Sequence, residues 1–354
     1  MQNQRFRNQI SWLMFAFSIL VIWVHSYNVA LFAGSDPGPA WEHAVQIETF
    51  WSIGVGQIAV PGFFMLSAYL FFRNFQMANL MEKWKSRSVS ILIPYIVWNL
   101  LYYLGYVIAT RLPGVQHVVG KDPTPFHMEE ILRAILRYSY APIFWYLFQL
   151  IILLVLAPQI YVLVKHRIVG LCYLAIILTA IYFRIDTGYP NMDALFYFSF
   201  AAYMAVHHRK WLEAKGDGDR AMTGVMLLII AVYSYGMMKT PGANVLWTIV
   251  YRWLVPTALW LITSFVELPE PKAWMRQSLF LYAIHFIVVR FMNKGAAMIF
   301  GEFLSSEKMC TAALGIYFAI PAAVIMISYV FARVLSKWMP PVWKILSGGR
   351  NLLG

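Results

Sequence analysis

Apolar blocks of about 20 residues recur along the whole chain, separated by short polar connections. A helix of that length, rising about 1.5 Å per residue, covers the ~30 Å of hydrocarbon in a bilayer. The 354 residues are 60% hydrophobic and only 12% charged, whereas soluble domains are about 25% charged. Because a helix satisfies its own backbone hydrogen bonds in hydrocarbon, this pattern predicts an all-α, polytopic integral membrane helical bundle.

The blocks predict about ten transmembrane helices within a single membrane-embedded domain, residues 1–354. A basic start precedes the first block, but no small-residue cleavage site follows it, so we interpret this block as an uncleaved span. A short interfacial helix is expected at 127–138, in the longest loop. The ten spans are expected at about 10–33, 47–72, 89–110, 142–164, 168–185, 193–208, 221–238, 244–266, 278–299 and 310–334.

Lys and Arg residues are distributed unevenly between the two sides of these spans. Of the 28 in the chain, 18 lie on the side of the N-terminus, 8 on the opposite side, and Arg252 and Arg290 within spans. The positive-inside rule therefore predicts that both termini are cytoplasmic. Because the cations cluster between the apolar blocks, the net charge of +12 indicates orientation in a lipid bilayer and not binding of a nucleic acid.

The chain has no motif of a soluble enzyme and no expected metal site. It contains no Walker A sequence, no Gly-rich dinucleotide fingerprint after a strand and no HExxH. Cys172 and Cys310 both lie in apolar segments, where they predict neither a disulfide framework nor a set of metal ligands.

Three ionisable residues, His25, His285 and Arg252, lie inside predicted spans, where such groups usually face protein or a water-filled cavity. For each, a structural role is the alternative to a functional one. His25 could be a neutral histidine bonded to a neighbouring helix. His285, with Tyr282 one turn before it, fits a packed histidine better than a catalytic one. Arg252 lies near the end of its span and could extend its side chain to the interface.

A polar stripe accompanies His25 along its helix. Ser11, Ser18 and His25 are spaced by seven residues, and Asn28 follows one turn later, so all four fall near one helix face. We therefore expect this face to contact protein or a cavity.

The segment "VPGFFMLSAYLFFRN", residues 60–74, is unusual for a span. Pro61 and Gly62 predict a kink or a loosened helix, and Ser67 with Ala68 would let another helix approach closely. Arg73 ends the span. With Lys83, Lys85 and Arg87, Arg73 forms a cytoplasmic cluster of four cations able to bind phosphate or anionic headgroups. "HHRKW", residues 207–211, is a second basic cluster, and membrane anchoring alone is the alternative for both.

Taken in order, five segments resemble the membrane-bound acyltransferase 3 family, whose members O-acylate cell-envelope glycans. They are "VIWVHSYN", "VPGFFMLSAYLFFR", "SRSVSILIPYIVWN", "APIFWYLFQLIILLVLAPQI" and "LFLYAIHFIV". Each segment is weak by itself, but the ordered set spreads over residues 10–290.

The resemblance implies an integral membrane O-acyltransferase of the bacterial cytoplasmic (inner) membrane. Its donor would be cytoplasmic acyl-CoA, with acetyl-CoA favoured, and its acceptor a hydroxyl of an envelope saccharide or lipid-linked glycan. The family's catalytic histidine matches His25, which would take the proton of the acceptor hydroxyl as general base. The family's arginine on the CoA side matches Arg73, with Lys83, Lys85 and Arg87 beside it.

Two positions depart from the family pattern. Met14 stands eleven residues before His25, where many members carry Arg or Lys, so a cation from Arg5, Arg7 or another helix would have to replace it. Ala68 replaces the usual Gly after Ser67. Two alternatives therefore stay open: a transporter of an envelope precursor with a path lined by His25, Arg252 and His285, or an inactive membrane scaffold.

Overall fold

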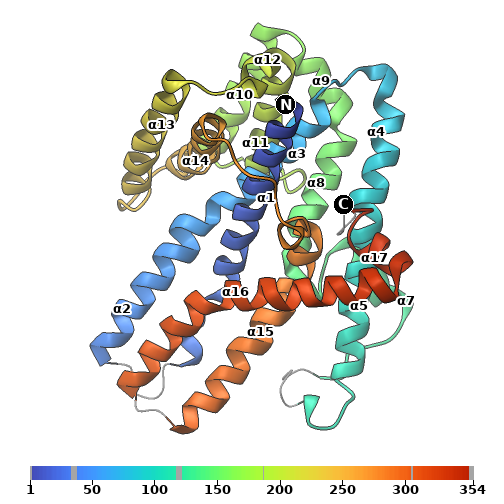
Figure 1. The fold of residues 1–354 in the computed structure, drawn as a ribbon, viewed down its shortest axis with the longest axis vertical. Helices are drawn as coiled ribbons and strands as arrows, with labels where there is room; N and C mark the ends of the chain where they lie inside the picture. The colour runs from blue at the N-terminus through green and yellow to red at the C-terminus, as the bar shows by residue number, and fades with distance from the viewer. Residues whose placement is uncertain (1, 33–37, 117–121, 186, 304–305, 351–354) are drawn as a thin grey trace.

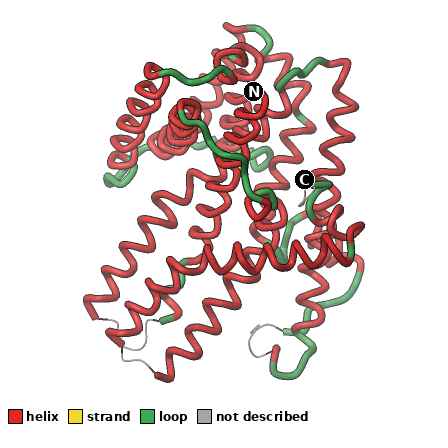
Figure 2. Tube along the Cα trace, in the orientation of Figure 1, coloured by secondary structure: helices red, strands yellow, loops and turns green. Residues whose placement is uncertain are grey.

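The computed structural model describes residues 2–32, 38–116, 122–185, 187–303 and 306–350. Within these ranges the chain forms helices and connecting loops but no strands, as Figure 2 shows. The predicted all-α membrane bundle is confirmed. The α-helices are α1 (Gln2–Ser26), α2 (Gly38–Thr49), α3 (Ala59–Phe72), α4 (Leu80–Arg87), α5 (Ile93–Ala109), α7 (Met128–Leu136), α8 (Trp145–Val155), α9 (Ala157–Val164), α10 (Arg167–Tyr182), α11 (Met192–His207), α12 (Arg209–Glu213), α13 (Gly218–Met237), α14 (Leu246–Phe265), α15 (Ser278–Phe303), α16 (Ser306–Trp338) and α17 (Pro340–Leu346).

Each of the ten predicted spans falls on helical structure, but the helices differ in length. Seven of those described are long and apolar enough to cross a membrane, and the pair α8 and α9, bent by 61°, would make an eighth span. Helices α10 and α11 have 16 residues each, or about 24 Å at 1.5 Å per residue. The number of spans and their orientation stay predictions. Helix α7 lies where the short interfacial helix was expected.

The irregular part of the second span comes before Pro61. Residues Phe50–Val55 form a π-helix and Gly56–Ile58 a 3₁₀-helix, and regular α3 then begins at Ala59. Pro61 therefore sits in the first turn of α3, where its missing N–H has no cost. Gly62 allows close packing of α1, because a Cβ there would lie 2.4 Å from the Phe17 ring.

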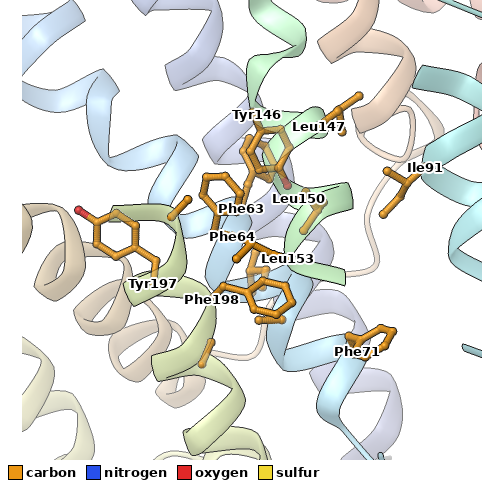
Figure 3. Close-up of a cluster of buried hydrophobic side chains, with 14 of the residues drawn as sticks. Phe63, Phe64, Phe71, Ile91, Tyr146, Leu147, Leu150, Leu153, Tyr197 and Phe198 are labelled. Carbon is orange, nitrogen blue, oxygen red and sulfur yellow. The ribbon is translucent and has the colours of Figure 1, made fainter. Parts of the chain in front are cut away.

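The core that holds the site is an aromatic cluster between α3, α8 and α11. Figure 3 shows Phe63 and Phe64 of α3 beside Tyr146 of α8, and the ring centroids of Phe64 and Tyr146 lie 4.7 Å apart. Phe198 of α11 is fully buried in this cluster. Edge-to-face contacts between such rings favour one arrangement over others. The cluster therefore fixes α3 against α8, and both helices line the pocket described below.

Two long helices, α15 and α16, pack against α1. The second half of α16 runs across the front of the bundle in Figure 1 and leads into α17, beside α5. The chain thus returns to the middle of the molecule near its C-terminus. This return brings residues up to 350 onto the same pocket as α1, α3 and α15.

Candidate active site

His25 and His285 lie side by side, with ring centroids 5.2 Å apart. His25 is in the last turn of α1, and His285 is near the start of α15. His25 is half-buried, whereas His285 is completely buried. The structure thus brings together two of the residues chosen from the sequence, and of the two only His25 keeps part of its surface exposed.

The tautomer of His285 follows from the hydrogen bond at its Nδ1. Its Nδ1 lies 2.6 Å from the carbonyl oxygen of Tyr282. A carbonyl oxygen only accepts, so Nδ1 carries the proton and Nε2 of the neutral ring is an acceptor. That Nε2 is buried and has no hydrogen-bond partner among the described residues. A basic nitrogen therefore lies unused next to His25.

Buried polar groups fix the chain directly after His25. The backbone N–H groups of Asn28 and Val29 donate to Glu48 Oε2 at 2.9 and 3.1 Å. Asn293 accepts from the Asn28 amide at 3.1 Å and donates to the Ser26 carbonyl at 3.1 Å. Helices α2 and α15 thereby anchor the end of α1. Sequence reasoning noted Asn28 but missed Glu48, although a lone acid at the start of an apolar block is a detectable signal.

A cavity of about 410 Å³, which we call the cationic pocket, opens beside the aromatic core. Lys83, Arg87 and Arg350 line it, and no Asp or Glu is among the described residues of its wall. Among the described residues, no carboxylate pairs with Arg87 or Arg350. Like charges held together without a counterion attract an anion, so this pocket is suited to a ligand with phosphate groups.

Aromatic rings connect the cationic pocket to the two histidines. Tyr282 lines the pocket, and its ring centroid lies 5.8 Å from that of His285. The Tyr282 hydroxyl donates to the carbonyl oxygen of Ile143, which fixes the ring. Ser67 and Tyr146 also line the pocket, with their hydroxyl oxygens 3.3 Å apart. Two further sequence candidates, Ser67 and Tyr282, are therefore in the pocket wall.

A second cavity, of about 300 Å³, lies farther along α15, and we call it the apolar pocket. Its wall combines apolar side chains of α5 and α15 with Arg290 and Lys294. Phe286 belongs to this wall, and its ring centroid lies 5.5 Å from that of His25. Along α15, the histidine pair therefore lies between Tyr282 of the cationic pocket and the charged residues of the apolar pocket.

Arg73 is not part of the cationic pocket. Its guanidinium contacts the Glu213 carboxylate through Nε at 2.7 Å and Nη2 at 2.8 Å, and lies 4.5 Å from the centroid of Phe6. Partial burial pushes the pKa of Glu213 upward, but hydrogen bonds from Arg73 and Tyr69 outweigh it and hold that pKa below its ordinary value. Arg73 thus has a carboxylate partner. Both residues line a separate cavity of about 1280 Å³, whose wall also includes residues 207–211.

The structure therefore divides the four-cation cluster expected from the sequence. Lys83 and Arg87 line the cationic pocket, Arg73 pairs with Glu213, and Lys85 is exposed. Lys83 also donates to the carbonyl oxygen of Arg73 at 3.0 Å. The sequence alone did not reveal this division: Lys83 and Arg87 share one face of α4, Lys85 lies on another face, and Arg73 follows the end of α3.

Arg252 and Met14 have different surroundings. Arg252, on α14, donates from Nη2 to Gln57 Oε1 at 2.8 Å and makes no such bond to either histidine. Met14 lines the cationic pocket. Arg5 donates to backbone carbonyls of Ser264 and Glu213 at 2.6 and 3.1 Å, so it does not replace the cation absent at Met14. Among the described residues, no group of three or more His, Cys, Asp or Glu is arranged to hold a metal ion.

A family model described as an acyltransferase domain matches residues 8–333. The chain belongs to the acyltransferase 3 family. Membership makes the protein an acyltransferase, and the apolar helices make it a membrane acyltransferase. Searches of curated proteins and of solved structures gave no match. The family match ends before α17 and Arg350, so the last contributor to the cationic pocket lies outside it.

Proposed function

We propose that this membrane acyltransferase transfers an acyl group, with acetyl favoured, from acyl-CoA to a hydroxyl of an envelope glycan, with His25 as general base. One observation carries the proposal: ring contacts link the half-buried His25 to the apolar pocket through Phe286, and to the cationic pocket through His285 and Tyr282. A transferase needs such a place, where two different substrates meet at one catalytic group.

The distance from the wall of the cationic pocket to His25 favours a long donor. Met14 lines this pocket and His25 lies eleven residues farther along α1, which corresponds to about 16 Å on a helix. A donor must therefore place its anionic groups at one end and its reactive carbonyl at the other. Coenzyme A thioesters have this form, since the phosphates and the thioester are at opposite ends of an extended arm. Arg87 and Lys83 would bind the phosphates.

The proposed chemistry uses His25 twice. Its neutral ring takes the proton from the acceptor hydroxyl while the hydroxyl oxygen attacks the thioester carbonyl carbon. The carbon–sulfur bond then breaks, and the imidazolium returns the proton to the leaving thiolate. The products are an ester and free CoA, and His25 is neutral again. Low solvent exposure around the histidine pair favours the neutral base at the start.

The acceptor would approach through the apolar pocket. An apolar wall suits a lipid chain, and Arg290 with Lys294 suits the phosphate that joins such a chain to a glycan. A lipid-linked glycan therefore fits this pocket better than a free saccharide. With the N-terminal side cytoplasmic, as the Lys and Arg bias predicts, the donor enters from the cytoplasm of a bacterial inner membrane and the acceptor from the other side.

The test is acyl transfer by purified protein. The protein, reconstituted in vesicles, is given acetyl-CoA labelled in the acetyl group together with glycolipids extracted from the envelope. Mass spectrometry should detect labelled ester on the glycan and free CoA in equal amounts. Envelope glycans that keep the same mass with and without the protein in cells, while their export changes, would support a transporter instead.

A further inference from the structure

The C-terminal segment, residues 347–350, is built into the cationic pocket. Gly348 and Gly349 have φ angles of +69° and +77°, a conformation that glycine adopts without strain. A Cβ on Gly348 would lie 2.5 Å from the carbonyl oxygen of Ser90. The segment therefore turns sharply and presses its backbone against the start of the α5 span.

Hydrogen bonds hold this segment at both ends. Trp98 donates to the Leu346 carbonyl at 3.1 Å, and Gly349 donates to the Lys344 carbonyl at 2.7 Å. The Arg350 carbonyl accepts from Trp343 Nε1 at 3.1 Å and from Ser347 Oγ at 3.2 Å. These contacts fix the backbone of Arg350.

The guanidinium of Arg350 is directed into the pocket. Its Nη1 donates to Ser278 Oγ, at the start of α15, at 2.6 Å. Burial and the neighbouring Arg87 lower the pKa of Arg350, but an arginine still keeps its charge in a protein. Two guanidiniums that face one cavity repel each other, and no carboxylate is among the described residues of its wall. An anion between the two guanidiniums would offset this repulsion and accept charge-assisted, bidentate hydrogen bonds from them.

We propose that Arg350 and Arg87 together bind a phosphate group of the acyl donor, which makes the C-terminal segment part of the donor site. This inference rests on the proposed CoA-dependent function. It adds a residue outside the family match, which ends at 333. Arg350, near the C-terminus, thus places a cation in the same pocket wall to which α1 contributes Met14.

The experiment measures acetyl-CoA binding by calorimetry, using full-length protein in a neutral detergent. Arg350→Ala should raise the Kd about tenfold or more, since hydrogen bonds to charged groups contribute about 1.5–3 kcal/mol. Lys344→Ala is the matched control: it removes an exposed cation from α17, so its Kd should stay near that of the wild type. Equal binding by the wild type and a folded Arg350→Ala protein would overturn the role of Arg350 and leave the proposed donor in place. A wild type that does not bind acetyl-CoA would overturn the proposed donor as well.

A second arm separates a CoA phosphate from a lipid headgroup. Adding phosphatidylglycerol to the micelles should leave the effect of Arg350→Ala on acetyl-CoA binding in place. If this lipid raises the Tm of the wild type but not of Arg350→Ala, while the Kd for acetyl-CoA is the same in both, the residue binds headgroups and the proposal fails. Should Arg350→Ala not fold, Arg350→Lys keeps the charge without the planar fork and should bind several-fold more weakly; unchanged binding would reject the proposal.

Discussion

The rings of His25 and His285 lie 5.2 Å apart, yet only His285 is completely buried. Hydrogen bonding to the Tyr282 carbonyl fixes the His285 ring, whereas no hydrogen bond of the described residues occupies the nitrogens of His25. A general base must reach the proton it removes. This geometry supports our proposal of His25 as the base, with the buried His285 ring packed against it.

Replacing His25 by Gln should abolish acyl transfer. Gln keeps hydrogen-bonding capacity and approximate size but accepts no proton at neutral pH, so turnover should fall by about 10²–10⁴-fold. Acetyl-CoA binding should change little, because the cationic pocket is intact. His285→Gln, the same substitution on the adjacent ring, is the control and should keep measurable turnover. Near-normal turnover by a folded His25→Gln protein would return His25 to a packing role.

Arg87 and Arg73 should affect different properties, although sequence reasoning placed them in one cluster. Arg87 lines the cationic pocket without a carboxylate partner among the described residues, so Arg87→Ala should raise the KM for acetyl-CoA about tenfold. Arg73 is paired with Glu213, so Arg73→Ala should lower the Tm and change this KM little. The exposed Lys85→Ala should change neither. The reverse pattern, with KM sensitive to Arg73 and not to Arg87, would move the donor to the larger cavity.

The pair of Arg73 and Glu213 should make stability depend on acidity. The folded-state pKa of Glu213 is below its ordinary value, which is about 4.3. The ionised Glu213 therefore contributes fully to the free energy of unfolding above about pH 4.3, and this contribution is lost as pH falls through the folded-state pKa. Glu213→Gln should lower stability by about 1–3 kcal/mol at pH 7. Melting curves should show this difference shrinking towards pH 3, and a difference independent of pH would contradict the ionic explanation.

Much of the fold could be predicted, because hydrocarbon allows few structures. Apolar blocks long enough to span a bilayer had to be helical, and the ten predicted segments all lie on helices. Local breaks were harder to predict. Pro61 suggested a kink inside the second span, but the π- and 3₁₀-helical turns precede it, since a proline fits the first turn of a new helix.

The candidate site was only partly predictable, because its residues meet through tertiary packing. His25 was chosen from one helix, and His285 from another, with no pattern to show that they touch. Nothing in the sequence indicated that Arg350 belongs to a binding site, because it was counted only among the cations on the predicted cytoplasmic side. Its role depends on two left-handed glycines that fold the segment back, and sequence periodicity does not report where a loop returns.

The orientation of the bundle can be tested directly. The excess of Lys and Arg on the N-terminal side predicts that both termini are cytoplasmic. Reporter fusions after residue 40 and in the loop 111–140 should be active outside the cytoplasm, whereas a fusion after residue 354 should be active inside. An external C-terminus would place Arg350 and the cationic pocket on the wrong side for cytoplasmic CoA.

Glu48 should be needed to hold His25 in position. The carboxylate is completely buried and accepts hydrogen bonds from the N–H groups of Asn28 and Val29, directly after the last turn of α1. Glu48→Ala leaves both donors buried without this acceptor, at about 1–3 kcal/mol each, so Tm and turnover should both fall. Glu48→Gln is the matched variant, because its amide oxygen can still accept these bonds, and it should retain most of the stability. Acetyl-CoA binding should be unchanged in both, since the cationic pocket is formed by other residues. If Glu48→Ala melts and turns over like the wild type, the polar contacts after His25 are not what positions the base.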